Sequence, residues 1–401
     1  MVKTLIFFTF FPKFSKRPAF PCRNRGMKRL FTGMLLSICM AGFLAGCGSS
    51  KQEEKDIFIA VEWNLQALFD GDENGSEYND YRESSHWNRE KYLARITAIS
   101  QAILKMSAGN DYQAEMPGLI GFLEVENAGV LKDLASGELS KHGYFWTAFA
   151  SLPGSPLGLG FVSSFPILEA RSHSITIGKN TAPRPVLEVR LEPGGKPLVF
   201  LLCHWKSKLG GDRATEALRR ASARVVQRRL RELMETEAGT PVIVMGDLNE
   251  NHDEFYRQSY LTALLPDDPS AAAMAHNAQG FFKNSNDFLV LSREKPPLAH
   301  FFPENTAALY SPWYGELNDG SYLFRDRWET IDHILLPESL FDGSGWEFSE
   351  CHVLNHPPFI SDNGEPAGYN PRTGRGLSDH LPLLLVLRQK GASQSAGTEL
   401  P

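Results

Sequence analysis

Short apolar runs that end on or begin beside polar side chains recur along the whole sequence, and this pattern limits the fold most strongly. The clearest runs cover residues 57–63, 118–123, 198–203, 241–245, 330–336 and 381–387. Runs of this length, rich in apolar and β-branched residues, predict strands. Between them, residues 87–106 and 213–234 carry apolar side chains at helical spacing. Strands mixed with helices, without a Pro/Gly/Ser-rich linker, predict one α/β domain over residues 56–388.

The remaining segments of this region indicate loops and polar faces. Composition is that of a folded globular protein, with 42% hydrophobic and 22% charged residues. Most arginines in residues 213–234 are expected to lie on a solvated helix face. Residues 251–329 are rich in Asn, Pro and aromatic residues with weak periodicity, which indicates long loops, and long loops in compact domains are commonly functional. The small, polar residues 389–401 predict a flexible tail.

Residues 1–46 are interpreted as an N-terminal extension followed by a signal peptide. From Met27, a charged start precedes an apolar stretch over residues 30–44 and then the sequence Leu44-Ala45-Gly46-Cys47. This segment resembles a bacterial lipoprotein signal, which would make Cys47 the lipidated first residue and residues 47–55 a tether. The resemblance implies a protein of the cell envelope, on its periplasmic or extracellular face, that meets the membrane through the lipid anchor only. Whether Met1 or Met27 is the start stays open.

The charge of the expected mature chain argues against sequence-independent binding of polyanions over its whole surface. The formal net charge is -6, but the first 46 residues contain eight of the 41 basic side chains and none of the 47 acidic ones. The remaining 33 basic and 47 acidic residues leave a balance of -14. Nucleic-acid contact would therefore have to be local, since a sequence-independent grip needs clustered Lys and Arg. Cys203 and Cys351 lie in apolar strand-like runs, where buried free thiols are expected more often than a disulfide.

Polar residues at strand ends are the candidate functional groups. Asn64 closes the first strand and Glu124 closes the second, and amide and carboxylate oxygens are hard ligands suited to magnesium or calcium. His204, Lys206 and Lys208 follow an apolar strand. Taken singly, each of these residues is more often a turn former or a structural residue.

Two further strands carry carboxylates at their ends. In Gly246-Asp247-Leu248-Asn249, alternation places Asp247 and Asn249 on one side, where they could hold a water and an anionic oxygen. Asp332 lies in an apolar strand and needs a partner, because an unpaired buried carboxylate is costly. His380, in Ser378-Asp379-His380, is the natural candidate, since a carboxylate-oriented imidazole is a common acid or base.

The ordered set Trp-Asn, Leu-Glu-Val, His-Trp-Lys-Ser-Lys, Gly-Asp-Leu-Asn, Ile-Asp-His and Ser-Asp-His resembles the endonuclease/exonuclease/phosphatase (DNase I-like) superfamily. The resemblance covers residues 57–387 and implies a four-layer αββα sandwich of two mixed β-sheets. It implies a monomeric, metal-dependent phosphoric ester hydrolase that uses Mg²⁺, with Mn²⁺ or Ca²⁺ as alternatives.

The resemblance also implies a role for each candidate residue. The metal ligands would be Asn64, Glu124 and Asp379. Asp247 and Asn249 would orient the attacking water and phosphate oxygens, and Asp332 would hold His380, which would contact the scissile phosphate together with His204. The substrate-binding cations would be Arg184, whose planar fork suits phosphate oxygens, Lys206 and Lys208. Leu123 replaces a Gln common in relatives, and the sequence offers no carboxylate partner for His204.

Three functions remain in competition at this stage. The preferred one is a secreted nuclease that cleaves DNA or RNA, because two lysines and Trp205 could grip a backbone and stack a base. The second is a phosphatase or phosphodiesterase acting on small molecules or lipid head groups, which suits the acidic charge and the tether. The third, a non-enzymatic binding protein, is disfavoured because every expected metal and water-orienting residue is present.

Overall fold

The computed structural model describes residues 5–10, 57–106, 115–177, 180–181, 184–258, 260–279, 287–303 and 306–390. The predicted signal from residue 27, Cys47 and the tether over residues 47–55 lie outside these ranges, as do residues 391–401. Within the described ranges, no helix is both long and apolar enough to cross a bilayer.

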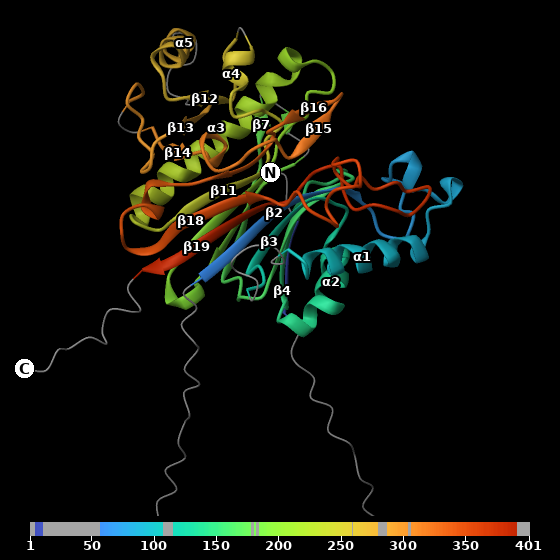
Figure 1. The fold of residues 1–401 in the computed structure, drawn as a ribbon. Coiled ribbons are helices and arrows are strands. Elements are labelled where there is room, and N and C mark those ends of the chain that lie inside the picture. The colour runs from blue at the N-terminus through green and yellow to red at the C-terminus, as the bar shows by residue number, and fades with distance from the viewer. Residues whose placement is uncertain are drawn as a thin grey trace, which may run out of the picture.

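Two large mixed β-sheets form the centre of the molecule (Figure 1). The seven-stranded sheet has the order β1 (Leu5–Phe10), β4 (Trp146–Ser151), β5 (Gly158–Ser163), β3 (Leu119–Val125), β2 (Ile57–Leu68), β19 (Leu383–Lys390) and β18 (Gly345–Val353). The five-stranded sheet has the order β17 (Asp332–Leu335), β11 (Val242–Asp247), β10 (Leu198–His204), β9 (Val186–Leu191) and β6 (Glu169–His173). All six strands predicted from the apolar runs are therefore present.

Helices cover the outer faces of both sheets (Figure 1). The helices are α1 (Arg89–Ile103), α2 (Ala128–Ser136), α3 (Asp212–Thr236), α4 (Glu254–Arg257) and α5 (Pro269–Gln279). Short 3₁₀ helices span Asn79–Tyr81, Glu83–Ser85, Glu138–His142, Pro193–Gly195, Pro312–Tyr314 and Glu338–Leu340. Asn88 and Asn127 cap α1 and α2, because their side-chain oxygens accept hydrogen bonds from the first free backbone N–H groups.

Three apolar clusters fill the three interfaces between these layers. Strand β10 shows how: Phe200 and Leu202 face the space between the sheets, whereas Val199 and Leu201 face α3. Alternate side chains of a strand point to opposite faces, so a strand buried on both faces is a continuous apolar run. A third cluster joins β2 and β3 to α1 and α2. The predicted four-layer αββα sandwich is confirmed.

The segment over residues 251–329 differs from the expectation of long loops. Besides α4 and α5, it contains a three-stranded parallel sheet of β12 (Leu264–Pro266), β13 (Leu289–Ser292) and β14 (Ala308–Tyr310). It also contains a hairpin of β15 (Tyr322–Phe324) and β16 (Arg327–Glu329). Strands of three or four residues are too short to show a period in the sequence. A further small hairpin pairs β7 (Thr176–Ile177) with β8 (Asn180–Thr181).

The two described cysteines are as the sequence predicts, whereas one arginine of α3 is not. Cys203 and Cys351 are both buried free thiols, as expected. Arg219 departs from the solvated face predicted for the arginines of α3, since its side chain is 1% exposed and pairs with Glu216 and Glu250. A buried guanidinium of this kind is tolerated because carboxylates and carbonyl groups take up its donors.

Candidate active site

The predicted site residues lie at one shared end of the two sheets because of strand direction. Strands β2 and β3 are parallel, as are β10 and β11, so each pair brings its carboxyl ends together. Strands β19 and β17 are antiparallel to β2 and β11, so their first residues reach the same end. In this register Asp247 lies directly opposite Asp332.

Strand alternation turns four of these side chains toward the space between the sheets. Asn64 has the parity of Phe58 and Ala60, whose side chains lie in the cluster between the sheets. The same parity relation holds for His204 with Leu202, for Asp247 with Met245 and for Asp332 with Ile334. Polar groups at the end of an otherwise apolar interface therefore converge on one place.

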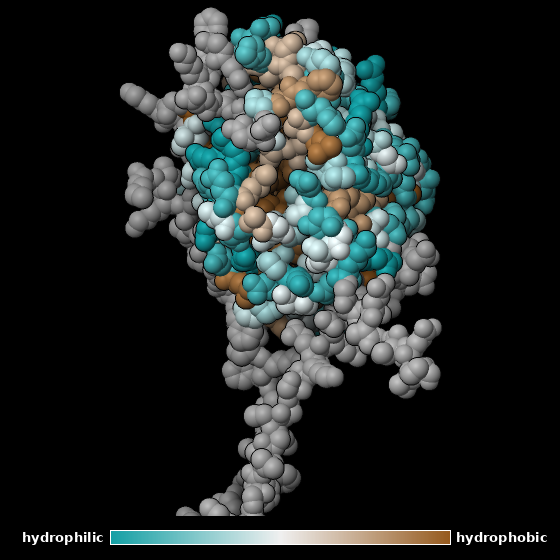
Figure 2. Space-filling view, turned by 90° about the vertical axis from the view of Figure 1, so that its left-hand side faces the viewer, coloured by the Kyte–Doolittle hydropathy of each residue, from teal (hydrophilic) through white to brown (hydrophobic). Residues whose placement is uncertain are grey.

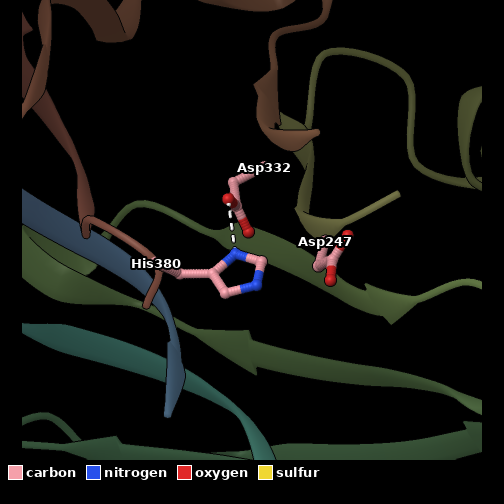
Figure 3. Close-up of side chains that lie close together, drawn as sticks. All are labelled: Asp247, Asp332 and His380. Atoms are coloured by element: carbon pink, nitrogen blue, oxygen red, sulfur yellow. Dashed lines mark hydrogen bonds and ion pairs between the residues drawn. The ribbon is translucent and has the colours of Figure 1, made fainter. Parts of the chain in front are cut away.

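Asp332 and His380 form the central pair of the site (Figure 3). Asp332 Oδ2 lies 2.9 Å from His380 Nδ1, so the partner expected for the buried carboxylate is the predicted one. Burial alone would lower the pKa of His380, but the charge and hydrogen bond of Asp332, with Asp379 and Asp247, raise it well above its ordinary value. The other ring nitrogen of His380, Nε2, lies 4.0 Å from Asp379 Oδ1.

The pKa of His204 is shifted in the opposite direction from that of His380. Burial, followed by the positive charges of Arg184 and His380, lowers its pKa well below the ordinary value, so its ring is neutral. Its Nε2 lies 3.5 Å from Asp247 Oδ2 and 3.7 Å from Glu124 Oε1. The sequence suggested no carboxylate partner for His204, and the structure places two beside it.

Asp247 is fixed by donors on both of its oxygens. The backbone N–H of Asn249 donates to Oδ1 over 2.9 Å, and the Asn64 amide donates to Oδ2 over 3.2 Å. Burial and then the charge of Asp332 raise the pKa of Asp247 to about 7. A carboxyl group with a pKa near neutrality is well placed to accept a proton from water. The Asn249 amide itself donates to the Trp205 carbonyl.

The three predicted metal ligands differ in their hydrogen bonds and in their exposure. Asn64 Oδ1 accepts the backbone N–H of Gln66, and Glu124 Oε2 accepts that of Ala67. Asp379 is the most open of the three, with 40% of its side chain exposed. One oxygen of Glu124 and the carboxylate of Asp379 accordingly remain available to a cation.

Residues in the left-handed backbone conformation change the direction of the side chains at the ends of β2 and β3. Gln66, Ala67 and Glu124 have φ of 50°, 57° and 60°, and the strand register shifts at the same points. A bulge with a left-handed residue reverses the alternation, so Glu124 leaves the outer face that regular pleating would give it. Such conformations cost free energy and persist at sites where the surroundings enforce them.

The three predicted substrate-binding cations have different surroundings. Arg184 lies near Trp205, whose carbonyl is 3.5 Å from its guanidinium, and its charge acts on His204 and Tyr78. Lys206 donates to its own loop at Ser207 and Leu209. Lys208 forms an ion pair of 2.6 Å with the buried carboxylate of Glu254, so its charge is already compensated.

Sequence reasoning missed several residues of the site. Glu62 precedes Asn64 by two residues on the same face of β2, is fully buried, and has neither carboxylate oxygen hydrogen-bonded. Burial, then Asp332, raises the pKa of Glu62 well above its ordinary value. Gln66 accepts the backbone N–H groups of Asp379 and Tyr369, and Ser321 donates to Asp332 over 2.6 Å. Glu62 could have been found from its apolar strand, but the serine and glutamine carry no sequence signal.

One cluster has spacing that could suit a cation directly. Among the described residues, ligand atoms of Asp247, Asp332 and His380 lie within 4.8 Å of one another. The His380 ring is already hydrogen-bonded to Asp332, which raises its pKa, so these three residues are better interpreted as an acid–base unit. The oxygens of Asn64, Glu124 and Asp379 are a more suitable set for a hard divalent ion.

An apolar hollow of the surface lies elsewhere. A cavity of about 460 Å³ is lined by the carboxyl end of α3, by β14 and by residues 337–342, and by none of the predicted site residues. Figure 2 shows the side of the molecule on which apolar side chains gather over a hollow. The chemistry and this cavity are therefore separate features.

A family comparison covers more than half of the chain, since residues 59–285 match the Endonuclease/Exonuclease/phosphatase family. No curated protein matches the sequence. Similar solved structures include the human Nocturnin catalytic domain with bound sulfate anion, at 16% identity and a TM-score of 0.47, covering 83% of this chain and 93% of that one.

Two further similar structures come from other organisms. Truncated TDP2 of Caenorhabditis elegans has 14% identity and a TM-score of 0.47, covering 83% of this chain and 98% of that one. A mannosyl-6-phosphatase of Bacteroides thetaiotaomicron has 16% identity and a TM-score of 0.44, covering 82% of this chain and 99% of that one.

Proposed function

This chain belongs to the endonuclease/exonuclease/phosphatase family, and from that premise we propose that it is a metal-dependent phosphoester hydrolase with its active site at the shared end of the two sheets. One observation carries the proposal: the carboxylates of Glu124, Asp247, Asp332 and Asp379 meet His204 and His380 there, with Asp332 Oδ2 2.9 Å from His380 Nδ1 and Asp247 Oδ2 3.5 Å from His204 Nε2. These surroundings raise the pKa of His380, whereas burial lowers the pKa of His204. Pairs of titratable groups whose pKa values are pushed apart are the usual mark of acid and base roles.

The donor set fits a hard divalent cation. Glu124, Asp247, Asp332 and Asp379 crowd acidic groups together, and buried carboxylate oxygens of Glu62 and Asp332 have no hydrogen-bond partner. We infer that Asn64, Glu124 and Asp379 would hold Mg²⁺, or Mn²⁺ or Ca²⁺ in its place. Such an ion, when bound, offsets negative charge on phosphate oxygens during hydrolysis.

The residues of the chain supply the remaining steps. Asp332 fixes His380 through Nδ1, so Nε2–H is free to donate to a phosphate oxygen. Asp247, held by Asn249 and Asn64, accepts the proton of the attacking water. His204, being neutral, turns a donor or acceptor nitrogen to the same place without adding charge, and Arg184 supplies a planar cation for the phosphate.

Within this activity, we favour a nuclease, and a small-molecule or lipid head-group phosphatase is the second candidate. The nuclease is supported by Lys206 and Arg184, two cations on the loops beside the site. The second candidate is supported by the acidic balance of the whole body. The sequence around Cys47 further supports a lipid-anchored protein of the cell envelope.

The test sets plasmid DNA and RNA against sugar phosphates, inositol phosphates and phospholipids, using the purified mature chain with Mg²⁺, Mn²⁺ or Ca²⁺. We expect hydrolysis that EDTA abolishes and that Asp247→Asn reduces by about a hundred- to a thousandfold. Turnover of nucleic acid alone supports the nuclease, and turnover of the small phosphoesters alone supports the phosphatase. Absence of hydrolysis across all substrates and metals, from a folded protein, rejects the proposed function.

A further inference from the structure

The β15–β16 hairpin packs an aromatic ring against His380, the proposed catalytic histidine. The ring of Tyr322 in β15 lies parallel to that of His380, with centroids 4.5 Å apart and planes 26° apart. An isolated β-bridge between the same two residues holds the backbones together. Burial, then the negative charges of Asp379 and Asp247, raise the pKa of the Tyr322 hydroxyl to about 12.

Further from the site, the hairpin presents a second aromatic ring, Phe324, and two arginines, Arg325 and Arg327. Phe324 is 48% exposed, and its ring is tilted by only 15° from that of Tyr322, at a centroid distance of 6.4 Å. The guanidinium of Arg325 lies 5.0 Å from the Phe324 ring centre. Arg327 pairs with Phe324 across the hairpin and therefore lies on the same face.

The turn, one apolar contact and hydrogen bonds at the base hold the hairpin in this position. Arg325 and Asp326 have φ of 50° and 63°, the left-handed pair required by a two-residue hairpin turn. Trp328, on the opposite face, packs against the apolar cluster of β2, α1 and α2. At its base Ser321 donates to Asp332, and the Ser321 carbonyl accepts the backbone N–H of Leu381. An exposed ring on such a base loses little freedom on binding.

Phe324 leaves a large apolar ring exposed beside a charged site, where it is accessible to a ligand. Its neighbours restrict the ligand. Two arginines beside an aromatic face suit an anionic chain that carries flat rings, whereas a sugar phosphate offers no flat ring. Figure 3 shows His380, the residue on which Tyr322 packs, next to Asp332 and Asp247.

We propose that the β15–β16 hairpin is a base-stacking subsite, in which Phe324 stacks on a nucleobase adjoining the scissile phosphate while Arg325 and Arg327 contact the backbone. The inference rests on the proposed hydrolase function and narrows its substrate class to single-stranded nucleic acid. The stacked base sets the register of the strand, so the phosphate next to it comes within reach of His380.

The test measures binding, not turnover. Asp247→Asn serves as the background, with Mg²⁺ present, so that the ligand is not cleaved. The probes are a labelled oligothymidylate of eight nucleotides and an abasic oligomer with the same number of phosphates. Phe324→Ala should weaken binding of the oligothymidylate about five- to a hundredfold, and leave binding of the abasic oligomer unchanged. Phe324→Tyr, which keeps the ring, should restore the affinity.

Phe301 provides the matched control. It is exposed to a similar degree, 50%, but lies beside α5 and Phe288 at a separate surface, so Phe301→Ala should change neither affinity. Equal weakening of both oligomers by Phe324→Ala, or weakening of neither, overturns the proposal. This outcome is distinct from failure of the hydrolase proposal, which appears as absence of turnover in the unsubstituted chain, because the binding comparison needs no turnover.

Discussion

Asp332 is the residue on which the protonation pattern of the site depends. Its side chain is completely buried, and Oδ2 accepts from both Ser321 and His380. Its negative charge is the main cause that opposes the effect of burial and raises the pKa of His380. A carboxylate of this kind fixes the orientation of the imidazole and stabilises its charged form.

Asp332→Asn keeps the shape of the side chain but removes the charge. We expect the turnover number on the preferred substrate to fall by about a thousandfold, while circular dichroism and the melting temperature show a folded protein. The control is Asp342→Asn, which changes an exposed carboxylate beside the separate apolar cavity and should leave turnover unchanged. Nearly full activity in Asp332→Asn would show that the ion pair between Asp332 and His380 is not needed for turnover.

Gly246 shows a backbone constraint immediately before Asp247. Its φ is +131°, and a Cβ placed there would lie 1.9 Å from the backbone oxygen of Cys203. That oxygen belongs to the neighbouring strand β10 and cannot move away without opening the sheet.

Gly246→Ala is therefore expected to lower the free energy of unfolding by about 2–4 kcal/mol, measured by urea denaturation. Gly239 is the matched control, because its φ is +85° but a Cβ at that position would have no neighbour within 4 Å. Gly239→Ala should cost about 1 kcal/mol from backbone strain alone. Similar losses in both variants would show that the contact with Cys203 is unimportant.

At the scale of elements, helix α3 is attached to the five-stranded sheet by a buried ion pair as well as by apolar packing. Glu188 of β9 accepts from Arg229 of α3 over 2.6 and 2.8 Å and lies 2.7 Å from His173 of β6. Burial opposes ionisation, but the hydrogen bonds from His173 and Arg229 lower the pKa of Glu188 to about 2.

The lowered pKa determines how this stabilisation varies with pH. A carboxyl group with a depressed folded-state pKa contributes stability above its unfolded value, here near 4.5, and loses it as the pH falls toward 2. Glu188→Gln should thus cost about 3 kcal/mol at pH 7 and much less at pH 3. Urea unfolding at both pH values measures the difference.

Glu169 offers the comparison within the same sheet. Its pair with Arg171 leaves 52% of each side chain exposed, so Glu169→Gln should change stability by less than about 1 kcal/mol. A loss at Glu188→Gln that is independent of pH would mean that packing, rather than charge, attaches α3 here.

At the scale of the whole molecule, the site joins the two sheets. Asp247 and Asp332 come from the five-stranded sheet, whereas the proposed cation ligands lie on or just before strands of the seven-stranded sheet: Asn64 on β2, Glu124 on β3 and Asp379 before β19. Because these three residues are far apart in the sequence, a cation held among them would bind only the folded chain. A ligand that binds the folded state alone raises stability, by about 2.7 kcal/mol at a hundred times its Kd.

We therefore expect millimolar MgCl₂ to raise the melting temperature of the unsubstituted chain by several degrees. In Glu124→Gln the increase should be reduced or absent, because one of the proposed ligand oxygens is lost. Differential scanning calorimetry of both proteins, with CaCl₂ and NaCl of matched ionic strength, separates site binding from screening. An equal shift with NaCl would argue against a cation site at this end of the sheets.

The apolar runs of the sequence predicted six strands and the polar groups at their ends, and the family resemblance implied the four layers. Apolar runs such as residues 198–203 and 241–245 could be assigned because buried strands and their polar ends leave a local signal. The pairing of Asp332 with His380 followed from the cost of an unpaired buried carboxylate. The lipidation of Cys47 stays a prediction.

Only the tertiary structure decided the contacts that have no local signature. The left-handed bulge that turns Glu124 inward, the two carboxylates beside His204 and the hairpin that places Tyr322 on His380 join residues far apart in the chain. The parallel sheet within residues 251–329 was missed for the related reason that its strands are too short to show a period. Strand propensity is set by neighbouring residues, but partners, protonation and exposure depend on which distant strands pack together, and that is fixed only when both sheets close on their common core.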